Sequence, residues 1–213
     1  ILAEGVREAS EKINGKTNEF AIHVKGLEPP AHDPRCKTST ALSFATSNRG
    51  ACHLQAFTSD FDEALTIEDL GVPCPNDRLS TEGKAQFVVK MQNLMCLYDS
   101  VTVCKFLLFS GMYISTLHEV INYATGWDLD SPTLNRCGER IFNLKRMYNI
   151  REGITNKDDI IPKRFLINIH QGNRDESEGF ENMLKEYYEI RNWSEQGRPS
   201  NNKLKELGLE YTV

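Results

Sequence analysis

The sequence predicts an all-α protein, built as an irregular multi-helical domain. Three observations support this fold class. Apolar residues recur at spacings of three and four in six or seven segments, as they do along one face of a helix. Capping residues and glycines bound most of these segments. The alternation of apolar and polar residues that is typical of a half-buried strand is seen in one short segment, Phe20 to Val24, where the signal is weak.

Two helices and a proline-rich loop are predicted at the start of the chain. Residues Ile1 to Ile13 carry an apolar stripe, and Asn14-Gly15 supplies the stop. The stretch LEPPAHDPR holds three prolines in nine residues, which predicts an extended loop because proline fixes φ and removes a backbone donor. Residues Thr38 to Ser47 can then form a helix capped at Thr38 or Ser39.

The remaining helices follow from their apolar faces and caps. They are predicted at about Ser80 to Leu97, Thr116 to Tyr123, Ser131 to Tyr148 and Glu178 to Arg191, with a final turn or two from Lys203 to Leu207. Thr116 with Glu119 makes a capping box, and Ser131 precedes a first-turn proline. Ser177 is the predicted cap of the long helix after it. The polar stretch NKDDIIPKRF is predicted as an ordered loop.

Length and charge narrow the class of function. A chain of 213 residues can bury a core without covalent staples. Its net charge of −5 and pI near 5.6 argue against nucleic acid as a main partner. The longest apolar stretch, Val101 to Gly111, is interrupted by Lys105 and Ser110 and falls short of the roughly 20 residues that span a bilayer, so no membrane partner is expected.

No leader is recognised, which makes a cytoplasmic location the default. Because the chain starts at Ile1 and reads at once as helix, we expect it to be part of a longer polypeptide.

The six cysteines are predicted to be reduced thiols. They are scattered through a core-sized chain and form no CxxC pair, so zinc-ribbon and ferredoxin spacings are absent. Any metal cluster would therefore need ligands from elsewhere. A different metal site, using Cys96, Cys104 and histidines, is a minor alternative because the two cysteines share a face only on an unbroken helix.

A polar stretch around the second predicted helix, AHDPRCKTSTALSFATSNRGACHLQAF, is the first candidate site. It places two histidines, an aspartate, two arginines and a cysteine within 22 residues: His32, Asp33, Arg35, Arg49, Cys52 and His53. On composition alone, a capped helix with a solvated arginine loop is the favoured interpretation. The functional alternative is a pocket wall in which His53 presents its imidazole to a substrate.

The segment LYDSVTVCKF is the second candidate. Asp99 and Cys104 are five positions apart, which is about 140° of rotation on a helix, so they would not share a helical face. If they act together, the backbone between them should be irregular or extended. Taken singly, Cys104 could be a small buried hydrophobe and Asp99 a helix cap. A third polar stretch, RCGERIFNLKRMYNIREG, is better explained as scaffold, because its charges can pair at short helical range.

Together these stretches resemble the C-terminal part of tungsten-containing aldehyde:ferredoxin oxidoreductases. The resemblance is carried by AIHVKGLEPPAHDPR, FATSNRGACHL, GERIFNLKRMYNIREG with DDIIPKRF, and MLKEYYEIRNW with KLKELGL, and it runs in order from about Leu2 to Leu209. It implies that residues 1–30 are the end of a middle helical domain and that residues 31–213 are the C-terminal helical domain. An N-terminal domain that forms the base of the cofactor would lie outside this chain.

The resemblance implies oxidation of a small aldehyde to a carboxylic acid, with electrons passing to ferredoxin. The implied cofactors are a tungsten (or molybdenum) bis-molybdopterin and a 4Fe-4S cluster, both of which need residues of the rest of the same polypeptide; a homo-oligomer is also allowed. In that family an Asp-x-x-Gly-Leu-Cys motif serves both groups. Cys104 would thus be the fourth thiolate ligand of the cluster, and Asp99 would accept hydrogen bonds from a pterin. His53 matches the histidine near the metal and would donate a hydrogen bond to the aldehyde oxygen.

Two positions depart from the family motif. This chain has Thr102 and Val103 where the motif has glycine and leucine, and loss of the glycine predicts a restricted backbone at that point. The departure motivates an alternative function: a cofactor-free helical structural or interaction domain that keeps the fold but has lost catalysis.

Overall fold

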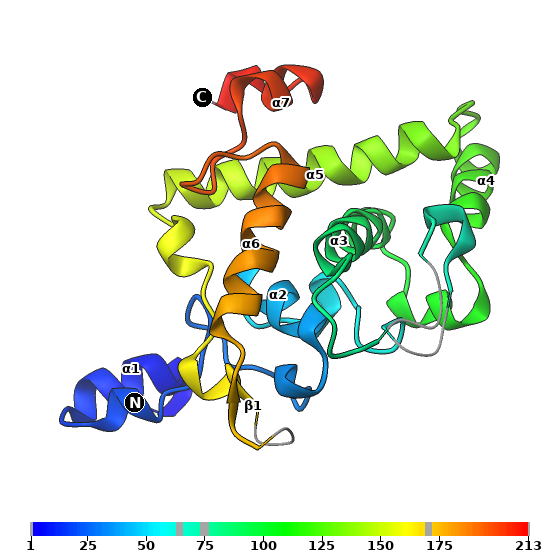
Figure 1. Ribbon diagram of the computed structural model, residues 1–213. Helices are drawn as coiled ribbons and strands as arrows, with labels where there is room; N and C mark the ends of the chain where they lie inside the picture. The colour runs from blue at the N-terminus through cyan, green and yellow to red at the C-terminus, as the bar shows by residue number, and fades with distance from the viewer. Residues whose placement is uncertain (1, 63–65, 73–76, 169–171, 213) are drawn as a thin grey trace.

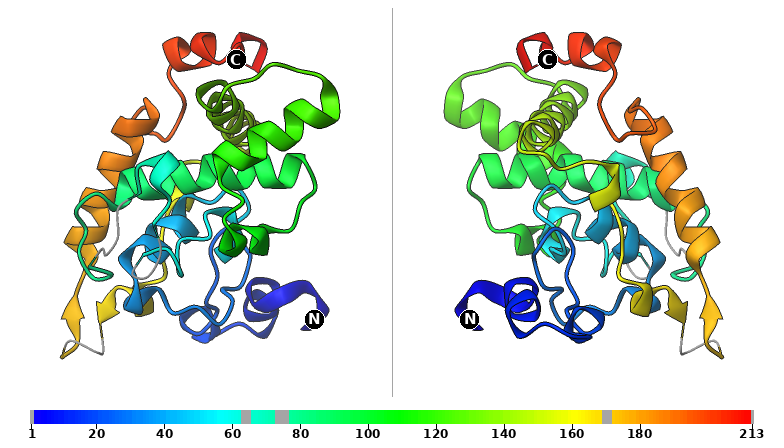
Figure 2. Two further views of the ribbon diagram at one scale, coloured as in Figure 1. Left: turned by 90° about the vertical axis from the view of Figure 1, so that its right-hand side faces the viewer. Right: turned by 90° about the vertical axis from the view of Figure 1, so that its left-hand side faces the viewer.

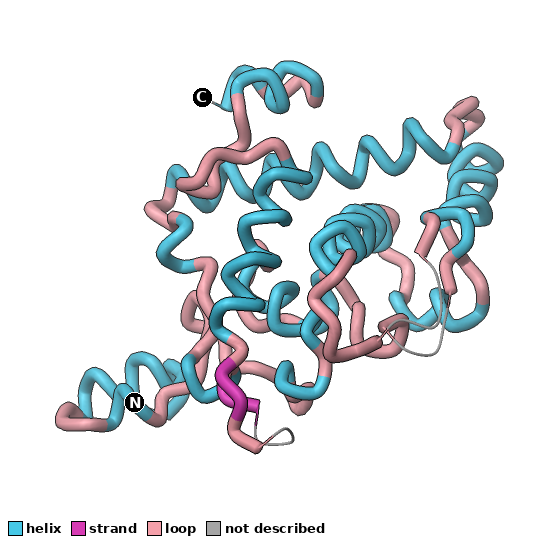
Figure 3. The backbone as a smooth tube through the Cα atoms, in the orientation of Figure 1, coloured by secondary structure: helices cyan, strands magenta, loops and turns pink. Residues whose placement is uncertain are grey.

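The computed structural model describes residues 2–62, 66–72, 77–168 and 172–212. Within these ranges the α-helices are α1 (Gly5–Ile13), α2 (Thr38–Thr46), α3 (Lys84–Ser100), α4 (Ile114–Thr125), α5 (Ser131–Arg151), α6 (Ser177–Arg191) and α7 (Asn201–Glu206). Short 3-10 turns join them, and one antiparallel hairpin pairs β1 (Ile167–Asn168) with β2 (Arg174–Asp175). The predicted all-α fold class is confirmed, and the tube in Figure 3 shows helices joined by long loops.

Helix α3 lies at the centre of the molecule, between α5, α6 and α2 (Figure 1). It is buried along most of its length and on most of its sides, which suits a helix without a continuous polar face. The axes of α3 and α5 can approach closely because Gly138 of α5 faces the carbonyl oxygen of Asn93, where an added Cβ would overlap that oxygen. Figure 2 shows α7 above α5 and α1 at the opposite end of the molecule.

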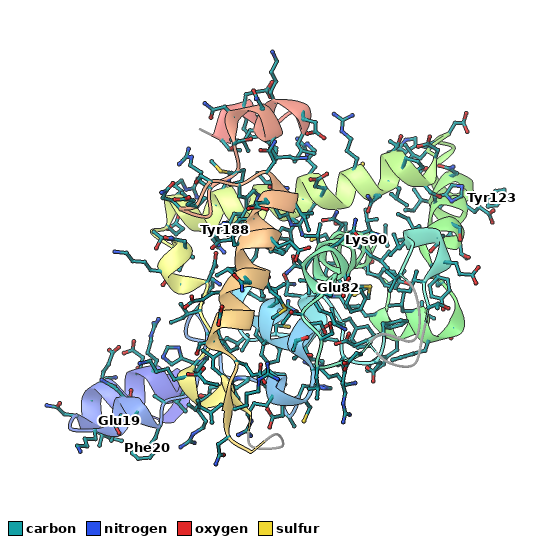
Figure 4. All side chains as sticks on the ribbon, in the orientation of Figure 1. Glu19, Phe20, Glu82, Lys90, Tyr123 and Tyr188 are labelled. Atoms are coloured by element: carbon teal, nitrogen blue, oxygen red, sulfur yellow. The ribbon has the colours of Figure 1, made fainter. Side chains whose placement is uncertain are left out.

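Charged and polar side chains are buried inside this packing. Asp159 is fully buried and forms ion pairs with Lys25 (2.8 Å) and Arg146 (2.7 Å). It also accepts a hydrogen bond of 2.6 Å from the hydroxyl of Tyr188, which projects from α6 (Figure 4). These contacts join three segments that are distant in the sequence. Burial of an unpaired charge is costly. The ion pairs therefore explain how the interior tolerates these charged side chains.

Several predicted element boundaries are wrong. Helix α3 starts at Lys84 rather than near Ser80, because Gly83 has φ +70° and ends the preceding turn, and it continues past Leu97 to Ser100. Helix α4 starts at Ile114, so Thr116 lies inside it and the predicted capping box does not form. The N-terminus of α4 is capped from a distant segment: the Asp69 carboxylate accepts a hydrogen bond of 2.8 Å from the backbone N–H of Ser115.

The helix caps predicted from serines and threonines are also displaced. The caps of α2, α5 and α6 are Lys37, Asp130 and Glu176 in place of the predicted Thr38 or Ser39, Ser131 and Ser177. Of these, Asp130 caps with its side chain, accepting a hydrogen bond from the N–H of Thr133. Each predicted serine or threonine lies one or two positions inside the helix, where its backbone is already helical.

The predicted strand from Phe20 to Val24 does not form. Only Val24 pairs, with Leu27, across a tight turn at Lys25 and Gly26. The hairpin of β1 and β2 was not predicted, since strands of two residues are too short for alternation to be visible. Over the described part of the chain, no helix is both long enough and apolar enough to cross a membrane. The cysteines that the structure describes are free thiols; Cys74 lies outside the described residues.

Candidate functional site

His53 begins a short 3-10 turn, η4 (His53–Gln55), that follows the loop after α2. The loop turns at Gly50, where φ is +90° and a Cβ would overlap the carbonyl oxygen of Val24, so a side chain is excluded there. The His53 imidazole stacks on that of His32, with 4.5 Å between ring centroids and 27° between ring planes. Both histidines of the first candidate stretch therefore lie side by side.

Asp99 lies in the last turn of α3, and Cys104 lies beyond the end of that helix. Thr102 has φ +58°. Cys104 has an extended backbone and directly precedes another 3-10 turn, η6 (Lys105–Ser110). The prediction of a non-helical backbone between Asp99 and Cys104 is confirmed. Thr102 takes the left-handed conformation that a glycine would take, at a cost that a β-branched residue ordinarily avoids.

The variant Thr102→Gly is expected to raise the free energy of unfolding by about 0.5–1 kcal/mol. Relief of the left-handed strain at Thr102 exceeds the backbone entropy that glycine adds to the unfolded chain. Urea denaturation of the two proteins measures the difference. The matched control is Thr116→Gly, at an exposed position inside α4, which should lose about 1 kcal/mol. Equal destabilisation by both substitutions would contradict the assignment of strain to Thr102.

Lys105 connects the segment Asp99–Cys104 to η4. Its ammonium forms an ion pair with Oδ1 of Asp99 (2.9 Å) and donates a hydrogen bond to the carbonyl oxygen of Leu54 (2.7 Å). Leu54 directly follows His53. Through Lys105 the structure brings Asp99 close to η4. Cys104 directly precedes Lys105 in the chain. Lys105 was not proposed as a site residue from the sequence, because its partners lie 6 and 51 positions away.

The surroundings of His53 favour a neutral imidazole. Partial burial lowers the pKa of His53 below its usual value of 6.5, and the neighbouring His32 lowers it further. The cations Arg49 and Lys105 act in the same direction, and Asp60 opposes them. A neutral imidazole carries one N–H donor and one acceptor nitrogen. His53 can therefore either donate or accept a hydrogen bond without first gaining or losing a proton.

Stability at acid pH gives a test of this electrostatic description. Because the pKa of His53 is lower in the folded state, the unfolded chain binds the proton first as the pH falls. The folded protein should therefore lose stability as the pH falls below 6.5 and through the folded pKa. His53→Gln should make the unfolding free energy less dependent on pH between 7.5 and 5, measured in urea. An identical pH dependence in the two proteins would contradict the lowered pKa.

Four phenylalanines, two of them in η6, pack against one another and form what we term the phenylalanine cluster: Phe57, Phe61, Phe106 and Phe109. Phe57 is buried, and its ring centroid lies 6.0 Å from that of Phe106 and 5.4 Å from that of Phe109. The outer two rings, Phe106 and Phe109, are 61% and 48% exposed. An apolar surface of this kind beside polar residues commonly marks a place that another surface covers.

The residues fit one part of a metal-cluster site rather than a whole one. Among the described residues, no group of three or more histidine, cysteine, aspartate or glutamate side chains could hold a metal ion. Cys104 has an exposed thiol and can supply a single ligand, and Asp99 keeps a partly exposed carboxylate. The alternative site built on Cys96 and Cys104 is contradicted, because Cys96 is buried within α3 while Cys104 faces outward.

Comparison with known proteins identifies the class to which this fold and these residues belong. The chain belongs to the aldehyde ferredoxin oxidoreductase family, since residues 1–209 match the family model described as "Aldehyde ferredoxin oxidoreductase, domains 2 & 3". Its curated relatives include the tungsten-containing aldehyde ferredoxin oxidoreductases of Pyrococcus horikoshii (37% identical, covering 99% of this chain) and Pyrococcus abyssi (36% identical, covering 100%). The chain spans about a third of the length of these relatives, 34% in each case.

A solved structure has a similar fold. It is the active site complex BamBC of benzoyl coenzyme A reductase, which superimposes with a TM-score of 0.67 over 97% of this chain and 36% of that chain. At 17% sequence identity the likeness shows the fold alone.

Proposed function

We propose that this chain is the helical part of a polypeptide that oxidises aldehydes to carboxylic acids, with ferredoxin as the electron acceptor. The observation that carries the proposal is the arrangement at the end of α3, where Lys105 contacts both Asp99 and the carbonyl oxygen of Leu54 in η4, and where Cys104 and His53 are the chain neighbours of Lys105 and Leu54. Membership of the aldehyde ferredoxin oxidoreductase family supports it. The cofactors would be a tungsten (or molybdenum) bis-molybdopterin and a 4Fe-4S cluster, and both need residues from the rest of the same polypeptide.

Each residue would contribute one interaction. The exposed thiol of Cys104 would be a cluster ligand, and the partly exposed Asp99 carboxylate would accept N–H groups of a pterin. The bound metal would supply the acceptor for the two electrons that leave the aldehyde. His53 would orient the aldehyde by donating its N–H to the carbonyl oxygen, and its lowered pKa leaves the second nitrogen free of a proton.

Metal analysis of the full-length polypeptide tests this proposal. After anaerobic purification we expect tungsten or molybdenum together with about four irons per polypeptide, and aldehyde-dependent reduction of ferredoxin. A folded full-length protein with neither metal nor iron would instead support the alternative, a cofactor-free structural or interaction domain. The conformation of Thr102 argues against that alternative, because the turn predicted to need glycine is formed without it.

Exposed apolar side chains support the proposed place of this chain in a larger polypeptide. Phe106 and Phe109 are exposed beside Cys104, and Phe20 and Ile13 are exposed at the end that carries α1 (Figure 4 labels Phe20). We propose that the other domains cover these surfaces, with residues 1–30 belonging to the middle domain and residues 31–213 to the C-terminal one. The assembled enzyme would act in the cytoplasm.

A further inference from the structure

We propose that Lys105 is a positioning residue that holds the Asp99–Cys104 segment against η4, and so keeps the carboxylate, the thiolate and His53 in one arrangement for the reaction. This inference rests on the proposed function and extends it to a residue with no assigned role. Its basis is the pair of contacts that one ammonium group makes to two separate parts of the chain.

Lys105 makes a direct side-chain link between these two parts, which also pack against each other. Its Nζ lies 2.9 Å from Oδ1 of Asp99 and 2.7 Å from the carbonyl oxygen of Leu54. Asp99 belongs to the end of α3, and Leu54 belongs to η4, next to His53. A single cation with several donors can satisfy a carboxylate and a carbonyl at once, which an apolar side chain of the same length cannot do.

The burial of Lys105 shows that the link is not an ordinary surface ion pair. Its side chain is only 10% exposed, whereas that of Asp99 is 34% exposed. A lysine withdrawn from water needs compensating partners, and these are the two oxygens just described. Because the Asp99 side chain is the more exposed of the two, its second carboxylate oxygen can still accept a hydrogen bond from a bound group while Lys105 is paired with Oδ1.

Lys105 also places a fixed positive charge beside the residues of the proposed site. It follows Cys104 directly and is one of the groups that lower the pKa of His53. The groups facing that imidazole are His32, Arg49, Asp60 and Lys105. A cation close to a cluster ligand favours the more negative, reduced state of the cluster. Removal of this charge should therefore make the cluster harder to reduce.

The test compares Lys105→Met, Lys105→Arg and the unaltered full-length enzyme. Lys105→Met keeps an unbranched side chain only one atom shorter but removes the charge and both contacts. We expect the midpoint potential of the cluster, followed by electron paramagnetic resonance during a redox titration, to shift to a lower value. We also expect kcat for aldehyde oxidation to fall by about 10- to 100-fold, with a smaller change in KM, because misplacement of reacting groups affects turnover. Lys105→Arg should restore the potential and part of kcat.

The matched control is Lys90→Met, since the Lys90 ammonium donates to the carbonyl oxygen of Gly71 (3.1 Å) at an exposed position and has no contact with the site. The proposal would be overturned if the cluster's midpoint potential and kcat changed no more in Lys105→Met than in this control. So would a failure of Lys105→Arg to restore either quantity.

A second measurement does not depend on the cofactors. Amide hydrogen exchange should increase in peptides covering residues 50–57 and 97–106 of Lys105→Met and remain unchanged elsewhere, because the link between these two segments is lost. Unchanged exchange in both peptides would overturn the link itself. Absence of metal from the unaltered enzyme would overturn the proposed function instead, and the exchange measurement would still decide whether Lys105 joins the two segments.

Discussion

Replacing Asp159 by alanine is expected to lower the free energy of unfolding by about 3–5 kcal/mol. Asp159 is fully buried and is the shared partner of Lys25, Arg146 and Tyr188. Its removal leaves the Arg146 guanidinium in the interior without its carboxylate, and arginine cannot give up its proton to relieve the charge. Burial already lowers the pKa of Lys25, with Asp159 opposing that effect, so Lys25 in the variant would lose its main reason to stay charged.

Urea denaturation at neutral pH measures this effect, with two further variants for comparison. Tyr188→Phe removes only the hydroxyl that donates to Asp159 (2.6 Å) and should cost about 1.5–3 kcal/mol, the range for a hydrogen bond to a charged group. Asp128→Ala removes an exposed carboxylate between α4 and α5 and should change stability by less than about 0.5 kcal/mol. A loss in Asp159→Ala no larger than that of Asp128→Ala would show that the buried ion pairs do not form.

The variant Cys104→Ser is expected to remove the iron from the full-length polypeptide. A serine hydroxyl is a much poorer ligand for iron than a thiolate, and four thiolates ordinarily hold a 4Fe-4S cluster. We expect iron to fall from about four atoms per polypeptide to near zero, measured by elemental analysis together with the loss of the cluster's absorbance. The fold should be unaffected because the Cys104 side chain is exposed at the start of η6.

Cys137→Ser is the matched control for this loss. Cys137 is also an exposed free thiol, but it lies on α5. The control should keep its full iron content. Retention of a normal cluster in Cys104→Ser, or equal loss in both variants, would remove Cys104 from the proposed ligand set.

The sequence was sufficient for the helical class and for one detail of the candidate site. The apolar stripes of α3, α5 and α6 could be recognised because side chains three and four positions apart share a helical face, so the signal is contained in each segment. The non-helical backbone between Asp99 and Cys104 could be predicted only on the assumption that the two residues act together, because on a helix they would be about 140° apart. The ends of the helices were less predictable: Asp69 caps α4 from a segment 46 positions away.

What the sequence by itself determined is therefore local: the helical segments, the absence of a shared helical face for Asp99 and Cys104, and the family motifs that those segments carry. The tertiary structure alone decided which polar groups meet. It placed the Lys105 ammonium on the Leu54 carbonyl, stacked His32 on His53, and enclosed Asp159 between Lys25 and Arg146. The physical reason is that a buried polar group must find its partner wherever packing brings one, and packing is settled by the whole core rather than by neighbours in the chain.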